Sequence, residues 1–167
     1  MGKARTAIVI AILSVIVLVA ALAAMSWKKA AQPAARAYVF GVSGKEFDIS
    51  MVAANESAQE KGLMNATITD DTLMIFVFPS LGDYPFWMEN TYANLDMMWL
   101  NIDNGAGKVV YIVRNATSCV GETVGWCINS TYYPNALANY VIEAKSGFAK
   151  ANNMTVGSNV TLRALTG

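Results

Sequence analysis

Histidine is absent from this chain of 167 residues, and several other residue types are scarce. There are two cysteines and four prolines, and only 14% of the residues are charged. Without histidine, the chain has no Ser-His or Cys-His pair for nucleophilic catalysis and no histidine general base. Two cysteines alone also do not complete a four-ligand zinc site, so we expect no metal and no cofactor.

A basic surface is missing as well. Twelve Lys and Arg balance twelve Asp and Glu, but Lys3, Arg5, Lys28 and Lys29 all lie near the N-terminus. From residue 30 onward, eight basic residues stand against twelve acidic ones, which gives a net charge of −4. Such a surface does not attract a phosphate backbone, so nucleic acid is not an expected partner.

One long apolar run stands out at residues 6–25, where Thr6 and Ser14 are the only polar residues. As a helix of twenty residues it would be about 30 Å long, which matches the core of a bilayer. The small residues at 21–23 fit a signal-peptide cleavage site, but the run is long for a signal core, and an uncleaved anchor is favoured. A pilin-like apolar helix packed in a filament is a further alternative. We predict a transmembrane signal-anchor at 1–29, a linker at 30–36 and one folded domain at 37–167.

Two features place this domain outside the cytoplasm, on a single-pass anchor in the cell membrane. Cys119 and Cys127 flank the stretch "VGETVGW" and predict a disulfide, worth roughly 2.5 kcal/mol, although two free thiols are the alternative. Six of the asparagines begin Asn-X-Ser/Thr sequons, which indicates a glycosylated exterior, the alternative being an asparagine-rich polar surface. These asparagines are Asn55, Asn65, Asn115, Asn129, Asn153 and Asn159.

The pattern after the linker is mainly that of strands. Ser43-Gly44 predicts a hairpin turn between two alternating stretches, and residues 101–110 predict another. Asn55 as N-cap and Gly62 as C-cap bound a short helix, and residues 146–154 suggest a second. Strands are predicted within 37–52, 72–78, 95–103, 108–115, 139–145 and 158–165. We therefore expect a mainly β fold, a compact β-sandwich or barrel-like domain with two short helices, preceded by the transmembrane helix.

Five blocks of this sequence, in order and spacing, resemble an uncharacterised family catalogued as domain of unknown function 192. They are "GLM" (62–64), "MIFVF" (74–78), "FWMENT" (86–91), "LDMMWL" (95–100) and "YVIEAKSGFAKANNMTVG" (140–157). The resemblance implies a β-rich sandwich behind a signal sequence or anchor, but no catalytic residues. With the sequons it suggests an archaeal surface protein. The chain departs from the pattern at Asn65 and Ala66, where an arginine is usual, and at Leu73, where a glycine is usual.

The predicted ligand site lies in the blocks between Phe86 and Leu100. Trp87 and Glu89 fall on one side of an alternating stretch, as a stacking ring beside a hydrogen-bond acceptor, although a salt bridge at Glu89 is the plainer interpretation. Asp96 begins a buried row of a central strand, so it should accept hydrogen bonds from backbone N–H groups or from Asn90 and Thr91. Trp87, Glu89, Asn90, Thr91 and Asp96 are the candidate ligand-binding residues.

These patterns favour a binding module of the cell envelope, for a glycan, a peptide or a partner protein. A small hydrolase is the alternative, with Glu89 and either Asp96 or Glu143 as its carboxylates at about 5 to 10 Å. A structural surface or filament subunit is another. The methionines could bind Cu(I), but filling of the core explains them more simply. The stretch "TDD" at 69–71, together with Asp83, could hold calcium or could only shape turns.

Overall fold

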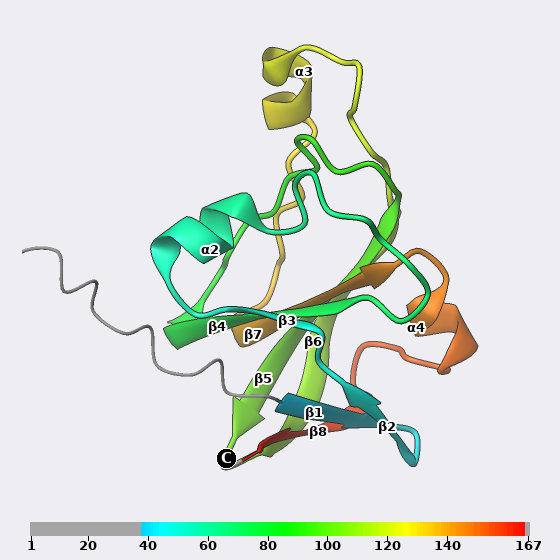
Figure 1. The fold of residues 1–167 in the computed structure, drawn as a ribbon. Helices are drawn as coiled ribbons and strands as arrows, with labels where there is room; N and C mark the ends of the chain where they lie inside the picture. The colour runs from blue at the N-terminus through cyan, green and yellow to red at the C-terminus, as the bar shows by residue number, and fades with distance from the viewer. Residues whose placement is uncertain (1–37, 166–167) are drawn as a thin grey trace, which may run out of the picture. The chain divides into compact units, whose positions relative to one another are not determined.

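The computed structural model describes residues 38–165 (Figure 1). The predicted transmembrane segment at 1–29 and the linker at 30–36 lie outside these residues. Among residues 38–165, none of the helices is long and apolar enough to span a bilayer.

Eight strands form a single sheet in the order β2-β1-β8-β6-β5-β7-β4-β3. Neighbouring strands are antiparallel, except for β3 and β4, which are parallel. The strands are β1 (Tyr38–Val42), β2 (Lys45–Asp48), β3 (Met51–Ala53), β4 (Leu73–Gly82), β5 (Leu95–Asp103), β6 (Ala106–Ala116), β7 (Ala138–Lys145) and β8 (Asn159–Ala164).

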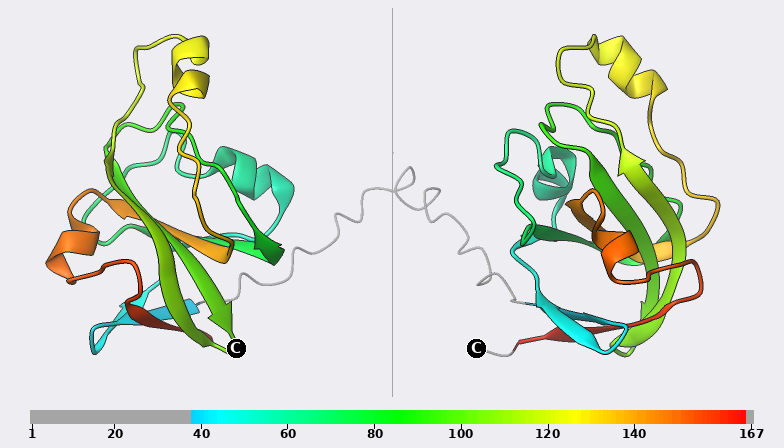
Figure 2. Two further views of the ribbon diagram at one scale, coloured as in Figure 1. Left: turned by 180° about the vertical axis from the view of Figure 1, so that it is seen from behind. Right: turned by 90° about the vertical axis from the view of Figure 1, so that its right-hand side faces the viewer.

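The two edges of the sheet are brought together by the chain itself. β2 and β3 are the edge strands, yet only Ile49 and Ser50 separate them in sequence, so the sheet must curl until its edges nearly meet. The Ser50 hydroxyl fixes this junction, because it donates to the Leu73 carbonyl at 2.8 Å and accepts from the Leu73 N–H at 3.1 Å. The fold is a half-barrel (Figure 2), so the barrel-like expectation is confirmed and a sandwich of two sheets is not what forms.

β5 is the central strand, and the predicted alternation along it is confirmed. Met98, Leu100 and Ile102 point into the space enclosed by the sheet and join its inner core. Leu95, Met97 and Trp99 point to the other face and join a second, outer core. Because both faces of the strand are buried from Leu95 to Leu100, this part of its sequence is apolar apart from Asp96, rather than alternating with polar residues.

The outer core is covered by helix α2 (Glu56–Lys61) and by the long connection from β4 to β5. Trp99 holds this connection in place, because its indole N–H donates to the Tyr84 carbonyl at 2.8 Å. Phe86 packs edge to face against both Phe76 and Trp99, with ring centroids 4.7 and 5.5 Å away. The connection therefore has a fixed position over the sheet.

Three short helices are present where two were predicted. α2 is capped as expected, since the Asn55 side chain accepts from the Ala58 N–H and Gly62 follows the helix with φ of 48°. The second predicted helix, α4 (Phe148–Ala151), is only four residues long and lies at one end of the space inside the half-barrel (Figure 2).

Helix α3 (Val124–Asn129) was not predicted, because Gly121 and Gly125 favour a turn in the stretch between the two cysteines. Thr123 caps it by accepting a hydrogen bond from the Trp126 N–H, and the Cys119–Cys127 disulfide anchors it, with Cα atoms 5.7 Å apart. The predicted disulfide is thereby confirmed. Both predicted hairpin turns are also found, with positive φ at Ser43, Gly44, Asn104 and Gly105.

Candidate functional site

Asp96 lies at the start of β5, is buried, and points to the inner face of the sheet. Its Oδ1 accepts a hydrogen bond from the Asn115 N–H at 2.9 Å, and its Oδ2 accepts from the N–H groups of Gly147 and Ala149 at 3.1 and 2.8 Å. The last two donors lie at the start of α4, so Asp96 caps that helix from a distant strand. The predicted donation by backbone N–H groups is confirmed, but Asn90 and Thr91 are not the donors.

The remaining candidate residues lie in the covering connection and are not gathered into one site. Trp87 and Glu89 are half-buried while Phe86 and Met88 are buried, so the predicted alternation holds. The Asn90 carbonyl accepts from the Asn65 N–H at 2.8 Å and thereby ties the connection to the turn after α2. Thr91 is buried and its hydroxyl donates to the Glu89 carbonyl.

Trp87 does line a small pocket, together with residues that are far apart in the sequence. We call it the carboxyl pocket, because the Glu143 side chain of β7 is part of its lining. Its volume is about 20 Å³, which is room for one group of the size of a water molecule. The lining residues are Gln59, Glu60, Lys61, Gly62, Leu63, Met64, Phe76, Phe86, Trp87 and Glu143.

The Glu143 carboxyl is the unusual member of this pocket. The residue is only 3% exposed, and its Oε2 has no hydrogen-bond partner in the described part of the chain. In the sheet register Glu143 pairs with Met74 on one side and Met97 on the other, so apolar side chains flank it on both neighbouring strands. Burial raises the pKa of Glu143 from 4.5 to about 8. The carboxyl is therefore mostly protonated at neutral pH.

Gly62 keeps the pocket open beneath the end of α2. A Cβ atom at this position would lie 3.3 Å from Cζ of Phe76 and 3.8 Å from Oε2 of Glu143. Its φ of 48° with ψ of −135° also strains any residue with a side chain. The "GLM" block thus brings the chain over Glu143 without filling the space above it.

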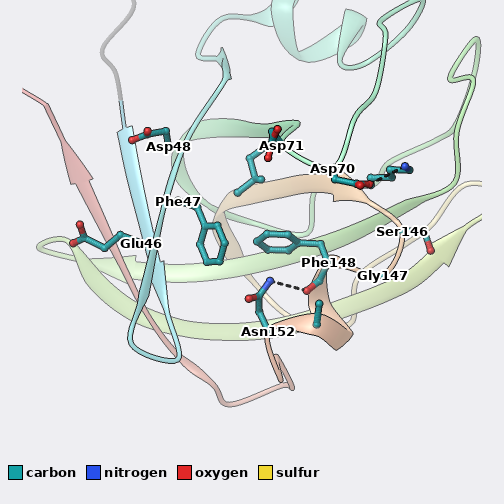
Figure 3. Close-up of a pocket in the computed structure, with 12 residues that line it drawn as sticks. Glu46, Phe47, Asp48, Asp70, Asp71, Ser146, Gly147, Phe148 and Asn152 are labelled. Carbon is teal, nitrogen blue, oxygen red and sulfur yellow. Dashed lines mark hydrogen bonds and ion pairs between the residues drawn. The ribbon is translucent and has the colours of Figure 1, made fainter.

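A larger cleft of about 590 Å³ lies on the other side of the molecule, between β2, the turn before β4, and α4 (Figure 3). Phe47 and Phe148 meet edge to face in it, with ring centroids 5.1 Å apart. Four carboxylates surround the two rings, but all are exposed to solvent: Glu46, Asp48, Asp70 and Asp71.

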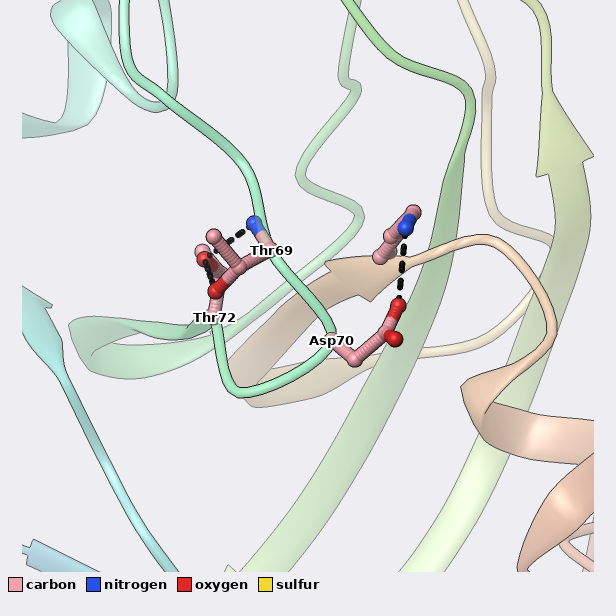
Figure 4. A network of polar contacts seen from close by, with 4 residues as sticks. Thr69, Asp70 and Thr72 are labelled. Atoms are coloured by element: carbon pink, nitrogen blue, oxygen red, sulfur yellow. Dashed lines mark hydrogen bonds and ion pairs between the residues drawn. The ribbon is translucent and has the colours of Figure 1, made fainter.

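The acidic turn at 69–72 has a structural explanation (Figure 4). The Thr69 N–H donates to the Thr72 hydroxyl at 2.9 Å, which closes the turn, and Asp70 pairs with Lys145 at 2.8 Å. Within residues 38–165, no three Cys, Asp or Glu side chains are grouped as metal ligands. Turn and ion-pair contacts therefore account for Thr69, Asp70 and Thr72.

The methionines behave as core side chains. Met74, Met88 and Met97 are buried in the outer core, Met98 lies in the inner core, and Met51 packs against the outer one. Of the methionines considered for Cu(I), Met64 is the one that lines the carboxyl pocket.

All six sequon asparagines are exposed, namely Asn55, Asn65, Asn115, Asn129, Asn153 and Asn159. Their side chains are therefore accessible for modification, whereas Asn152, outside the sequons, is buried. Glycosylation itself stays a prediction.

Sequence reasoning assigned Glu143 only to a catalytic pair and missed its neighbours in the pocket. A signal was present, because Glu143 is the one charged residue in the apolar stretch "YVIEA" (140–144) of a predicted strand. A lone acid in a strand with two buried faces predicts a buried carboxyl. Its association with Gly62, Met64 and Phe86 depends on long-range packing that local patterns do not contain.

Two solved structures share this fold. A Sinorhizobium meliloti protein, for which a role as a transcription regulator has been suggested, is 23% identical with a TM-score of 0.61, over 77% of this chain and 92% of its own. A Novosphingobium aromaticivorans protein of unknown function is 24% identical with a TM-score of 0.59, over 74% and 82%. At this identity the likeness shows the fold alone.

No curated protein sequence matches this chain. The sequence pattern of the DUF192 family, described as "Uncharacterized ACR, COG1430", matches residues 39–162. This match spans nearly all of the half-barrel, and the chain therefore belongs to the DUF192 family.

Proposed function

We propose that this protein is a membrane-anchored binding module of the cell envelope, with the carboxyl pocket as its ligand site. One observation carries the proposal: four of the five blocks that resemble the family pattern contribute residues to this one pocket. They supply Gly62 to Met64, Phe76, Phe86 with Trp87, and Glu143. Residues so distant in sequence meet around a buried carboxyl oxygen that has no partner within residues 38–165.

The arrangement of carboxylates favours binding over hydrolysis. Asp96 and Glu143 point to opposite faces of the sheet, because Asp96 pairs with Ala144 in the register and Glu143 with Met97. Three backbone N–H groups already occupy the Asp96 oxygens, and Glu89 does not line the carboxyl pocket. The acid pairs considered for glycoside hydrolysis are therefore not gathered in that pocket.

An extracytoplasmic location is supported by three independent features. Cys119 and Cys127 form a disulfide, which persists in oxidising compartments. The six sequon asparagines are exposed. The apolar run at 6–25 has the length and composition of a membrane anchor.

The location is tested by the intact mass of the protein extracted from its native membranes. We expect an intact N-terminus, added glycan mass that enzymatic deglycosylation removes, and an increase of about 2 Da on reduction. A bare mass with free thiols would overturn the proposed topology.

Binding is tested with isolated cell-envelope material and three purified full-length proteins, the wild type, Glu143→Gln and Asp83→Asn. Asp83 is exposed and lies outside the carboxyl pocket, so it controls for the chemical change from acid to amide. We expect the wild type and Asp83→Asn to bind equally and Glu143→Gln to bind at least tenfold more weakly. Turnover of a glycoside or peptide by the wild type, lost in Glu143→Gln, would instead identify an enzyme.

A further inference from the structure

The carboxyl pocket combines three properties that select one kind of chemical group. A buried carboxyl oxygen that lacks a partner among the residues that the structure describes forms part of its wall. Three aromatic side chains, Phe76, Phe86 and Trp87, also line it. Its volume of about 20 Å³ admits a single small group.

Each property excludes some ligands. An unpaired carboxyl oxygen gains most from a hydrogen-bond donor, and more from a charged donor than from a neutral one. Aromatic faces attract cations. The volume excludes a guanidinium or a quaternary ammonium group, both of which are several times larger than a water molecule. A primary ammonium group satisfies all three conditions.

We propose that the carboxyl pocket binds the primary ammonium group of an amine-bearing ligand, with Glu143 as its acceptor and the aromatic side chains around it. The assignment rests on the proposed binding function and names the chemistry of the ligand. A lysine side chain of a peptide and an amino sugar of a glycan both present such a group.

The charged groups near the pocket are consistent with this assignment. Glu60 and Lys61 also line it, and both are exposed on α2. Neither makes a salt bridge within residues 38–165, where the ion pairs are Lys145–Asp70 and Arg163–Glu46. Lys61 carries an ammonium group of its own, so it is the internal competitor that an experiment must control.

Bound ammonium also changes the protonation of Glu143. Burial keeps the pKa of this carboxyl near 8 when no cation is beside it. A positive charge in contact favours the ionised form and lowers the pKa. Amine binding near neutral pH therefore releases the Glu143 proton to solvent, which gives a direct signature of the site.

The test uses the full-length protein labelled with ¹³C at the glutamate carboxyl carbons. The chain has six glutamates, and the signal of Glu143 is identified by its loss in Glu143→Gln. We expect methylammonium to shift the Glu143 titration to lower pH, and tetramethylammonium, Na⁺ and K⁺ at equal ionic strength to leave it unchanged. An equal response to all four cations, or no response to methylammonium, would overturn the assignment.

Four variants show which residues are responsible for methylammonium binding. Glu143→Gln should weaken methylammonium binding at least tenfold, and Trp87→Leu roughly threefold through the lost cation–π contact. Glu56→Gln is the matched control, because Glu56 is an exposed acid on α2 outside the pocket, and it should bind within twofold of the wild type. Lys61→Gln should bind as well as the wild type or better. Loss of binding in Lys61→Gln would mean that amines act through Lys61, which contradicts the proposal.

Two further ligands separate the sources of the ammonium group. Nα-Acetyl-lysine amide, whose side-chain amine is free, represents a peptide, and glucosamine represents a glycan. Tighter binding than that of methylammonium by one of the two identifies the source of the ammonium group. If envelope material binds through Glu143 but no amine competes, the amine assignment fails and the binding function stands. If Glu143→Gln binds envelope material normally, both fail.

Discussion

Asp96 and Glu143 are both buried in adjacent strands of one sheet, but their surroundings are opposite. Three backbone N–H groups satisfy Asp96, and it fixes the start of α4 on the inner face. Glu143 lies between methionines on the outer face, with an oxygen that lacks a partner in the described part of the chain and a pKa raised to about 8.

The difference shows how two buried acids can be distinguished. A carboxylate whose oxygens are all used contributes to the stability of the fold and has no capacity left for a ligand. A carboxyl that is buried without a partner lowers stability when it ionises, and a ligand that completes its hydrogen bonds removes that cost. The two sites should therefore respond in opposite ways to removal of the acid.

The largest effect is expected for Asp96→Ala, which leaves three buried N–H groups without an acceptor. Because each buried N–H group that loses its charged acceptor is destabilising, we expect the free energy of unfolding to fall by about 4 kcal/mol. Urea denaturation measures this change. Asp83→Ala, at an exposed site, should lie within about 0.5 kcal/mol of the wild type. A loss below about 1 kcal/mol in Asp96→Ala would show that the capping role is wrong.

Glu143→Gln should instead stabilise the protein, and the gain should depend on pH. The folded-state pKa of Glu143, about 8, lies above the ordinary value of 4.5. The folded protein therefore keeps a proton that the unfolded chain has released, and the associated stability, full below pH 4.5, is lost as the pH rises toward 8.

For the wild type relative to Glu143→Gln, this loss amounts to about 3 kcal/mol between pH 5 and 7. Urea denaturation of both proteins across this range measures it, and the difference should be constant below pH 4 and above pH 9. Parallel stability curves for the two proteins would mean that burial does not raise the pKa of Glu143.

The sequence predicted Asp96 better than Glu143 for a physical reason. In "LDMMWL" the apolar residues around Asp96 fall on both faces of a strand, which implies that the acid is buried and must be hydrogen-bonded. Its donors, however, come from residues 115, 147 and 149, which sequence spacing does not bring together. The environment of Glu143 depends on Met74 and Met97, which the sheet register positions, and on Gly62, which long-range packing brings over the carboxyl.

The difference between local and long-range contacts also explains which parts of the fold the sequence predicted. Hairpin turns at Ser43-Gly44 and Asn104-Gly105 and the N-cap at Asn55 are local, and the sequence predicted them. The closure of one sheet into a half-barrel depends on long-range pairings, such as β1 with β8 and β4 with β7, which place β2 and β3 at the two edges of the sheet. α3 was missed because its disulfide and Thr123 cap offset the unfavourable helix propensity of Gly125.

Reduction of the Cys119–Cys127 disulfide tests whether α3 affects the surroundings of Glu143. Because the closed loop is short, reduction should lower the free energy of unfolding by roughly 2.5 kcal/mol. The pH dependence caused by Glu143 should be unchanged, since neither cysteine lines the carboxyl pocket. Denaturation at pH 5 and 7, with and without reductant, measures both quantities. A changed pH dependence after reduction would show that α3 affects the surroundings of Glu143.

The smallest effect is expected at Asn55, which caps α2 locally, as Asp96 caps α4 from a distance. Asn55→Ala removes the hydrogen bond to the Ala58 N–H, at 2.9 Å, and should cost about 1 kcal/mol. Ser57→Ala is the matched control, because it removes the same sequon while the cap remains.

If α2 covers Glu143 as a rigid element, fraying of its first turn in Asn55→Ala should leave the Glu143 titration unchanged, because Gln59 still donates to the Val77 carbonyl at 2.8 Å. Carboxyl ¹³C NMR of both variants measures this, and a lower Glu143 pKa in Asn55→Ala alone would show that the cap helps to exclude water from the pocket.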